Sequence, residues 1–207
     1  DGFVYSGKEI TPTVVVTYTG SDGSDSSKTL VLGKDYTVTG DSGTAAGHYT
    51  LTVTGKDDGD YTGSVTKDWT IKPLTVRVSS VTLSDKVYDG TTKGSSDNVA
   101  SVNFKRGSSE SDIVTLQRED YTIKSVTYAD ANVSNDAQKV EVEVTLKNSN
   151  YIFTGNKQTE QVDTQGKIAK ASANNLKPQT GEINVVNNKK ATYTLNLNDL
   201  LPKLPVG

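Results

Sequence analysis

Residues 140–146 read Val-Glu-Val-Glu-Val-Thr-Leu, and this stretch decides the fold class. Its apolar and polar side chains alternate strictly, and successive side chains of a β-strand point to opposite faces of a sheet. The stretch therefore predicts a strand with one buried face and one solvent-facing side. Similar alternation recurs at residues 13–18 and 49–54, while no stretch shows the period of 3.6 residues that is typical of an amphipathic helix. The sequence predicts an all-β protein.

Clusters of Gly, Ser and Asp separate the expected strands, as at Gly40-Asp-Ser-Gly43 and Lys56-Asp-Asp-Gly-Asp60. Short strands joined by such turns favour antiparallel hairpins packed as an Ig-like sandwich. Pro73 follows Trp69-Thr-Ile-Lys72, where it would end a strand and stiffen a short hinge. We therefore expect modules at 1–73 and 74–170, followed at 171–207 by a linker and the first hairpin of a third module.

An internal repeat supports this division, because five sequence features occur in the same order in both halves. The pairs are Tyr5-Ser-Gly7 with Tyr88-Asp-Gly90, Asp35-Tyr-Thr-Val38 with Asp120-Tyr-Thr-Ile123, the strands at 49–54 and 140–146, Asp60-Tyr-Thr-Gly63 with Asn150-Tyr-Ile-Phe-Thr-Gly155, and Trp69-Thr-Ile-Lys-Pro73 with Gly166-Lys-Ile-Ala-Lys170. Conserved order across five features indicates two diverged copies of one module.

The second copy carries a recognisable opening, Lys86-Val-Tyr-Asp-Gly-Thr-Thr92. It resembles the YDG-type repeats of bacterial surface proteins, and the first half, which closes on Trp-Thr-Ile-Lys-Pro73, is similar to another repeat type of such proteins. The resemblance implies an extracellular, non-catalytic unit from a bacterium. The lack of cysteine fits an exported protein of a Gram-positive bacterium. The fold it implies is a tandem Ig-like sandwich, with a compact β-grasp-like module as the alternative.

Composition argues against several classes of function. The net charge is −3 with acidic and basic residues interspersed, so the clustered basic surface that nucleic-acid binding requires is missing from the sequence. Cysteine is absent and histidine occurs once, which leaves few ligands for zinc or other soft metals. No apolar run approaches the ~20 residues that cross a bilayer, so we expect no membrane insertion of these residues.

Candidate catalytic residues are few. His48 opens a strand just ahead of Tyr49 and is expected to point outward, away from any partner of a catalytic triad. The carboxylate groups at Asp57/Asp58/Asp60, Glu119/Asp120 and Asp22/Asp25 lie in turns, where such residues usually cap the backbone. None has the spacing of a calcium loop, although a weak calcium site in one of them stays open. We therefore expect no catalytic, cofactor-binding or metal-binding residues, and no cofactor.

Two residues of the strand at 64–71 need a separate explanation. Trp69 is in phase with Val65 and Ile71, so we expect it in the core and not on a sugar-binding surface. Lys67 shares that face, and we expect its ammonium to reach past the sheet edge into water as a free amine. The alternative for Lys67 is an intramolecular isopeptide crosslink to an aspartate, since residues 1–73 contain no asparagine.

These observations predict a non-enzymatic module array that acts as a stalk or adhesin-type unit, extracellular and associated with the cell surface or cell wall. Two rivals stay open: a module that binds a glycan or a host protein through loops, and accessory domains of a larger secreted enzyme. The ligand is unknown. We expect a monomer, in which the segment 171–207 could dock on a neighbouring copy.

Overall fold

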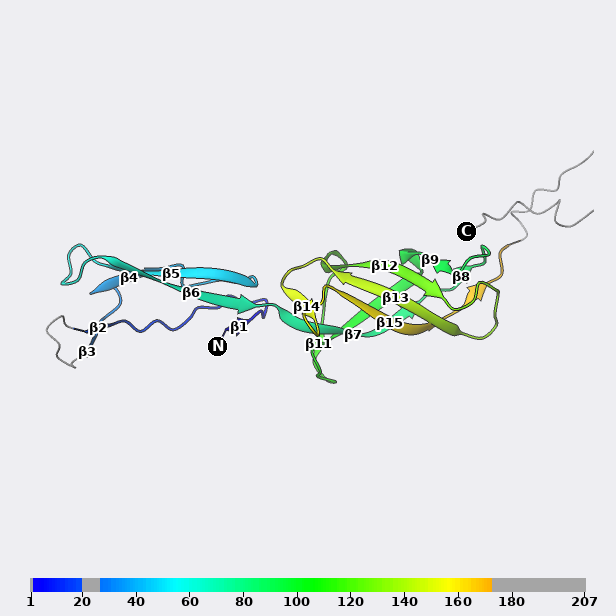
Figure 1. Ribbon diagram of the computed structural model, residues 1–207, viewed down its shortest axis with the longest axis horizontal. Helices are drawn as coiled ribbons and strands as arrows, with labels where there is room; N and C mark the ends of the chain where they lie inside the picture. Colours follow the sequence, from blue (N-terminus) through cyan, green and yellow to red (C-terminus); the bar gives the residue numbers. More distant parts are fainter. Residues whose placement is uncertain (1, 20–26, 173–207) are drawn as a thin grey trace, which may run out of the picture. The chain divides into compact units, whose positions relative to one another are not determined.

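The computed structural model describes residues 2–19 and 27–172. Within these ranges the chain forms sixteen β-strands and two single-turn 3-10 helices, with no α-helix (Figure 1). The prediction of an all-β protein is confirmed. The expected third module lies almost entirely outside the described residues, and so do Asp22 and Asp25. No helix in the described ranges is long and apolar enough to cross a membrane.

By its contacts the chain forms two compact units. Unit 1 comprises residues up to Arg77 together with Phe104–Tyr121 and Leu146–Thr159. Unit 2 comprises Val78–Asn103, Thr122–Thr145 and the chain from Glu160 to the end of the described residues. These units do not test whether 1–73 and 74–170 fold separately, so that boundary stays a prediction; at Pro73 itself one strand ends at Lys72 and the next begins at Leu74.

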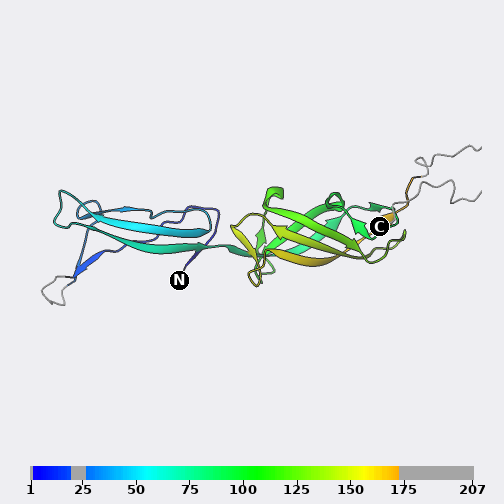
Figure 2. The same cartoon turned by 45° about the horizontal axis from the view of Figure 1, so that its top comes forward.

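The first half of the chain contains a four-stranded sheet in the order β1-β6-β5-β4. Its strands are β1 (Phe3–Val4), β4 (Tyr36–Thr39), β5 (Gly47–Gly55) and β6 (Ser64–Lys72). The long hairpin β5–β6 forms because turn residues separate two alternating stretches, and β4 pairs antiparallel with β5 (Figure 2). A separate hairpin joins β2 (Thr17–Thr19) to β3 (Ser27–Thr29).

One face of this sheet carries a small core. Its buried residues are Tyr36, Leu51 and Val53, each at most 9% exposed. Partly buried side chains pack against these three from the sheet and from the segments before β2 and after β3: Val14, Val16, Leu30, Val38 and Trp69. With Ile71, which is completely buried at the end of β6, the described part of 1–73 has four buried apolar residues. The number is small because an extended segment and a short hairpin cover the sheet only in part.

The second half contains two four-stranded sheets, ordered β11-β10-β7-β14 and β15-β13-β12-β9, and the two-stranded pair β16-β8. The strands are β7 (Leu74–Leu83), β8 (Lys86–Val87), β9 (Lys93–Gly94), β10 (Val99–Arg106), β11 (Ile113–Val114), β12 (Tyr121–Tyr128), β13 (Gln138–Leu146), β14 (Tyr151–Phe153), β15 (Thr159–Gly166) and β16 (Ile168–Ala169). The four apolar residues of 140–146 are all buried, three of them completely, as the alternation predicts.

The internal repeat appears as a repeated set of strand contacts. In the first half β1 pairs in parallel with the end of β6, and the Tyr5 N–H donates to the carbonyl of Lys72 at 2.8 Å. In the second half β8 pairs in parallel with β16, and the Tyr88 N–H donates to the carbonyl of Ala169 at 2.9 Å. Each closing pair joins residues that the sequence comparison had aligned.

A backbone conformation and a further hydrogen bond also recur at aligned positions. Gly7 and Gly90, which follow the two tyrosines, both have positive φ angles, of 73° and 79°, where glycine is favoured over other residues. The carbonyl of Asp35 accepts from the Lys56 N–H at 3.3 Å, and that of Asp120 accepts from the Lys147 N–H at 2.7 Å. At these aligned positions the two halves therefore share local structure as well as sequence order.

Candidate functional site

The described candidate catalytic residues do not gather in one site, and His48 and Asp58 contact neighbouring residues of their own strand pair or turn. His48 is exposed, and its Nδ1 lies 3.2 Å from the hydroxyl of Thr70 on the neighbouring strand. Asp57 and Asp58 are exposed in the turn between β5 and β6, where Asp58 forms an ion pair with Lys56 at 3.4 Å. In the part of the chain that the structure describes, no three His, Cys, Asp or Glu side chains gather in a way that could hold a metal ion.

Asp120 has a structural role that the sequence did not specify. Its carboxylate accepts from the Gln117 N–H and from the side-chain amide of Asn148, each at 2.7 Å. These contacts hold the 3-10 helix that precedes β12 (Arg118–Asp120) against Asn148, just after the end of β13. Its neighbour Glu119 is exposed in the same turn.

Trp69 and Lys67 lie on the same face of β6 but in different surroundings. The Trp69 ring stacks on Tyr49 with centroids 4.6 Å apart, and its Nε1 donates to the carbonyl of Gly40 at 3.0 Å. Trp69 is half-buried and packs against the small core, close to the expected position. Lys67 is exposed and lies opposite Leu51 on β5.

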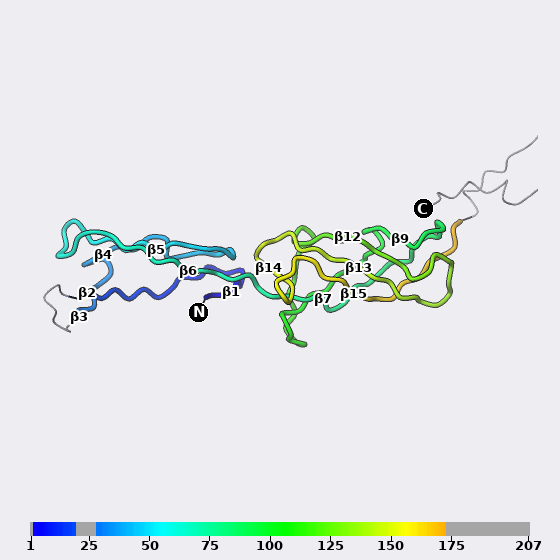
Figure 3. The backbone as a smooth tube through the Cα atoms, in the orientation of Figure 1, coloured from blue at the N-terminus to red at the C-terminus, as the bar shows by residue number. Residues whose placement is uncertain are grey.

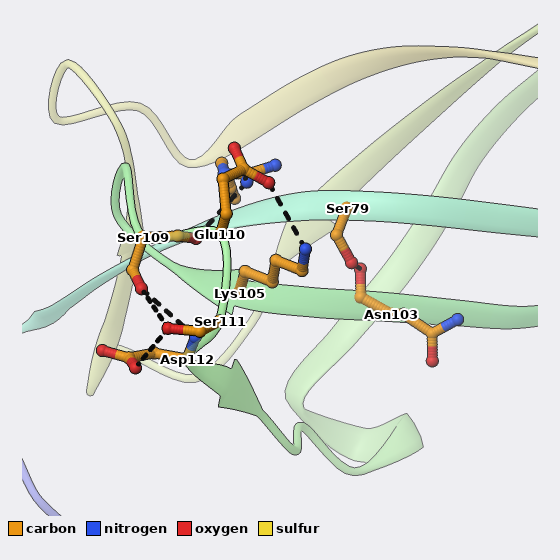
Figure 4. Close-up of polar contacts among 8 residues, drawn as sticks. Ser79, Asn103, Lys105, Ser109, Glu110, Ser111 and Asp112 are labelled. Atoms are coloured by element: carbon orange, nitrogen blue, oxygen red, sulfur yellow. Dashed lines mark hydrogen bonds and ion pairs between the residues drawn. The ribbon is translucent and has the colours of Figure 1, made fainter.

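The turn between β10 and β11 holds a cluster of polar side chains (Figure 4). Glu110 accepts from Arg77 at 2.7 Å and from Lys105 at 3.4 Å. These hydrogen bonds, the one from Arg77 first, lower the pKa of Glu110 below its usual range. Ser109 and Asp112 bond to each other within the turn, through the Asp112 N–H and the Ser109 hydroxyl at 3.2 Å. The cluster shapes a turn, and its exposed carboxylate is expected to contribute little stability.

The Tyr-Asp-Gly sequence builds the most unusual polar site of the described residues. Lys86 is 4% exposed, and its ammonium forms an ion pair with the Asp89 carboxylate and donates to the carbonyl of Thr91 at 3.1 Å. The same Asp89 oxygen accepts from the Thr91 N–H at 2.9 Å and from the Thr91 hydroxyl at 3.0 Å. We call Lys86, Asp89 and Thr91 the YDG latch.

The YDG latch lies where β8 pairs with the closing strand β16, so it fixes the turn that follows the first strand of the closing pair. Burial favours a raised pKa for Asp89, but the hydrogen bonds from Lys86 and from the Thr91 backbone and hydroxyl outweigh it and lower the pKa. The carboxylate therefore stays ionised, which a nearly buried lysine requires. The sequence showed the motif, but a two-residue strand is too short for its alternation to predict that Lys86 is buried.

An open groove of about 620 Å³ lies beside the β2–β3 hairpin. Tyr18 and Tyr61 line it with their ring centroids 5.2 Å apart, and the ammonium of Lys28 lies 5.6 Å from the Tyr61 centroid. The sequence had offered no anchor for a sugar, because Tyr18 in β2 and Tyr61 in the connection between β5 and β6 are far apart in the sequence and are brought together only by the fold.

No protein in the curated collection matches the chain. Residues 70–161 match the family described as the YDG domain, a range that contains the whole YDG latch and confirms the YDG-type repeat predicted for the second half.

Proposed function

We propose that the chain is a pair of non-enzymatic modules that act as part of a stalk or adhesin, from an exported surface protein of a Gram-positive bacterium. The match of residues 70–161 to the YDG domain supports this proposal. The absence of cysteine is consistent with an exported protein of a Gram-positive bacterium. We propose tandem Ig-like sandwiches as the fold, with modules at 1–73 and 74–170.

The observation that carries the proposal is the repeated closing pair. In each half a strand near the start runs parallel to the last strand: β1 with β6, and β8, which follows β7, with β16. Tension that acts on the two ends of such a pair slides its strands past each other. The hydrogen bonds between them lie across the pulling direction and must break together, not one after another. Such an arrangement resists force better than a hairpin pulled open from one end. The repeat therefore keeps the feature that a stalk needs.

Single-molecule pulling of the 207-residue chain from its two ends tests the proposal. We expect two unfolding events, and we expect Tyr88→Pro to lower the force of one of them, because proline removes the N–H that bonds to Ala169. The other event is an internal control within the same molecule. Unchanged force in both events, or unfolding at the force of an unstructured chain, would contradict a role in bearing tension.

A second candidate function is glycan binding, favoured by the groove with Tyr18 and Tyr61. Aromatic rings at its wall could stack on the apolar face of a sugar, while Asp60, which also lines the groove, could bond a hydroxyl. NMR titration with cellohexaose and chitohexaose tests it. Shifts confined to the groove and lost in Tyr61→Ala would support binding, whereas no shifts at millimolar sugar would argue against these two glycan classes.

A further inference from the structure

The outer edge of β6 is largely unpaired among the described residues. In the sheet order β1-β6-β5-β4, β1 covers only Ile71 and Lys72 of the nine residues of β6. Residues 64–68 are exposed, so this edge offers backbone N–H and C=O groups to any strand that approaches. Proteins usually protect an edge of this length with a bulge, a proline or a covering loop.

A groove of about 420 Å³ lies next to this edge. One wall is the segment Pro12–Thr17. The other is the sheet face formed by Leu51 and Val53 of β5 and by Val65, Lys67 and Trp69 of β6. Val15 is 71% exposed and Val65 is 62% exposed, so apolar side chains on both walls face solvent.

Residues 11–16 form no strand, although they run alongside the β5–β6 hairpin (Figure 3). The groove therefore lies over the face of β5 and β6, beneath an extended segment whose Val14 and Val16 pack against the core. Alternate side chains of a strand added to the free edge of β6 would point toward this same face.

The sequence contains a segment that fits this place. Tyr193-Thr-Leu-Asn-Leu197, outside the described residues, repeats the pattern of Tyr49-Thr-Leu-Thr-Val53 in β5. β5 already pairs with β6 on its other edge, with Tyr49 opposite Trp69, Leu51 opposite Lys67 and Val53 opposite Val65. A strand of the same pattern on the free edge would direct Tyr193, Leu195 and Leu197 into the groove, and a leucine opposite Lys67 is already accepted within the sheet.

We propose that residues 192–198 of a second copy of this chain add as a strand to the β6 edge, antiparallel as β5 is, and fill the groove. A second copy is favoured because the junction then joins a segment that follows the last module to the first module of the next copy, which continues the order of modules already present. Such a head-to-tail contact does not close on itself and would generate chains of copies. The inference stands apart from the stalk role, since association and unfolding force are separate measurements.

The test measures mass against concentration for the 207-residue chain by light scattering, from about 1 µM to about 1 mM, the range for weak association. We expect the mass of the wild type to rise with concentration. Val65→Lys, which places a charge in the groove, and Leu195→Lys, which places one on the added strand, should each be monomeric. Thr66→Lys changes an exposed residue on the opposite face of β6 and should associate like the wild type.

Mixing the two monomeric variants is the decisive step. The Val65→Lys chain keeps an intact segment 192–198 and the Leu195→Lys chain keeps an intact edge, so one junction can form and we expect a 1:1 dimer. Circular dichroism checks that the variants fold, and Val15→Lys on the other groove wall replaces Val65→Lys if the latter does not. A wild type that is monomeric throughout, association that survives Leu195→Lys, or a mixture that stays monomeric would overturn the proposal.

Discussion

Removing Asp89 is expected to destabilise the second half far more than removing Lys86, although the two residues form one ion pair. In Asp89→Ala the buried ammonium of Lys86 keeps only its bond to the Thr91 carbonyl, and the Thr91 N–H loses its acceptor. In Lys86→Met the apolar stem is retained and only the charge is lost. The Asp89 side chain is 48% exposed, so water can solvate its carboxylate when Lys86 is replaced.

The magnitudes follow from these contacts. Breaking a fully buried ion pair costs about 3–5 kcal/mol, and a buried donor without an acceptor costs about 1–3 kcal/mol. Because Asp89 is half-exposed, we discount the first figure for solvent screening and expect about 2–3 kcal/mol for Asp89→Ala. For Lys86→Met we expect about 1 kcal/mol or less, and for Lys86→Met with Asp89→Asn a similar value. The single change to alanine should be the worst of the three.

Urea unfolding of the full chain measures these free energies. In thermal melts the transition of the second half should fall by about 10–20 °C in Asp89→Ala, at roughly 4–8 °C per kcal/mol for a domain of this size. Asp97→Ala, at an exposed aspartate nearby, is the matched control and should leave stability nearly unchanged. If Lys86→Met proved as costly as Asp89→Ala, the explanation by an unpaired buried ammonium would be wrong.

The same ion pair sets a dependence on acid. The pKa of Asp89 is lowered in the folded protein, so its contribution is present above the ordinary aspartate pKa of about 3.9 and is lost as the pH falls through the lowered value. The difference in stability between the wild type and Asp89→Ala should therefore shrink on acidification below that range. A difference that stayed constant down to strong acid would mean that the carboxylate charge does not matter.

Three further predictions follow from other residues. Burial, with Tyr5 and Asp120 nearby, raises the pKa of Tyr151 to about 12, so the wild type should lose stability relative to Tyr151→Phe as the pH rises from about 10 through 12; parallel melting curves would contradict this. Lys67 is exposed, so intact mass should equal the sequence mass, and a deficit of about 18 Da abolished by Lys67→Ala would instead show a crosslink that releases one water. EDTA should leave the melting temperature unchanged, and a large drop would reveal a calcium-binding turn.

The sequence predicted burial best in β13. All four apolar residues of the alternating stretch 140–146 are buried there, so the apolar face of β13 is covered along its length. In β6 the same kind of alternation correctly places Val65 and Trp69 on one face of the sheet. It does not predict that Val65 is 62% exposed. A period of two reveals which residues share a face, and it contains no information on whether another element covers that face.

The polar sites depended on contacts that local patterns do not encode. The residues of the YDG latch lie within six positions of one another, yet Lys86 is buried only because β16, some 80 residues later, pairs with β8. β12 shows a related effect: Tyr121 and Ile123 are buried, and then Val126 and Tyr128, so the buried phase shifts by one residue inside the strand. Such a shift is set by the neighbouring strands and leaves no clear mark in the sequence.

The closing pair shows how two diverged copies meet one structural requirement with different chemistry. Phe3 pairs with Ile71, and at the aligned position Lys86 pairs with Ile168. Phe3 is 40% exposed and contacts Trp69 edge-on at 5.8 Å, so an aromatic contact holds the first strand in place. Lys86 is buried and held by the carboxylate of its own turn. A buried ion pair adds little net free energy of folding compared with an apolar contact. We therefore attribute to this ion pair the fixing of the turn after Tyr88 more than a gain in stability. Asp89 accepts hydrogen bonds from Thr91 as well as from Lys86, as this role requires.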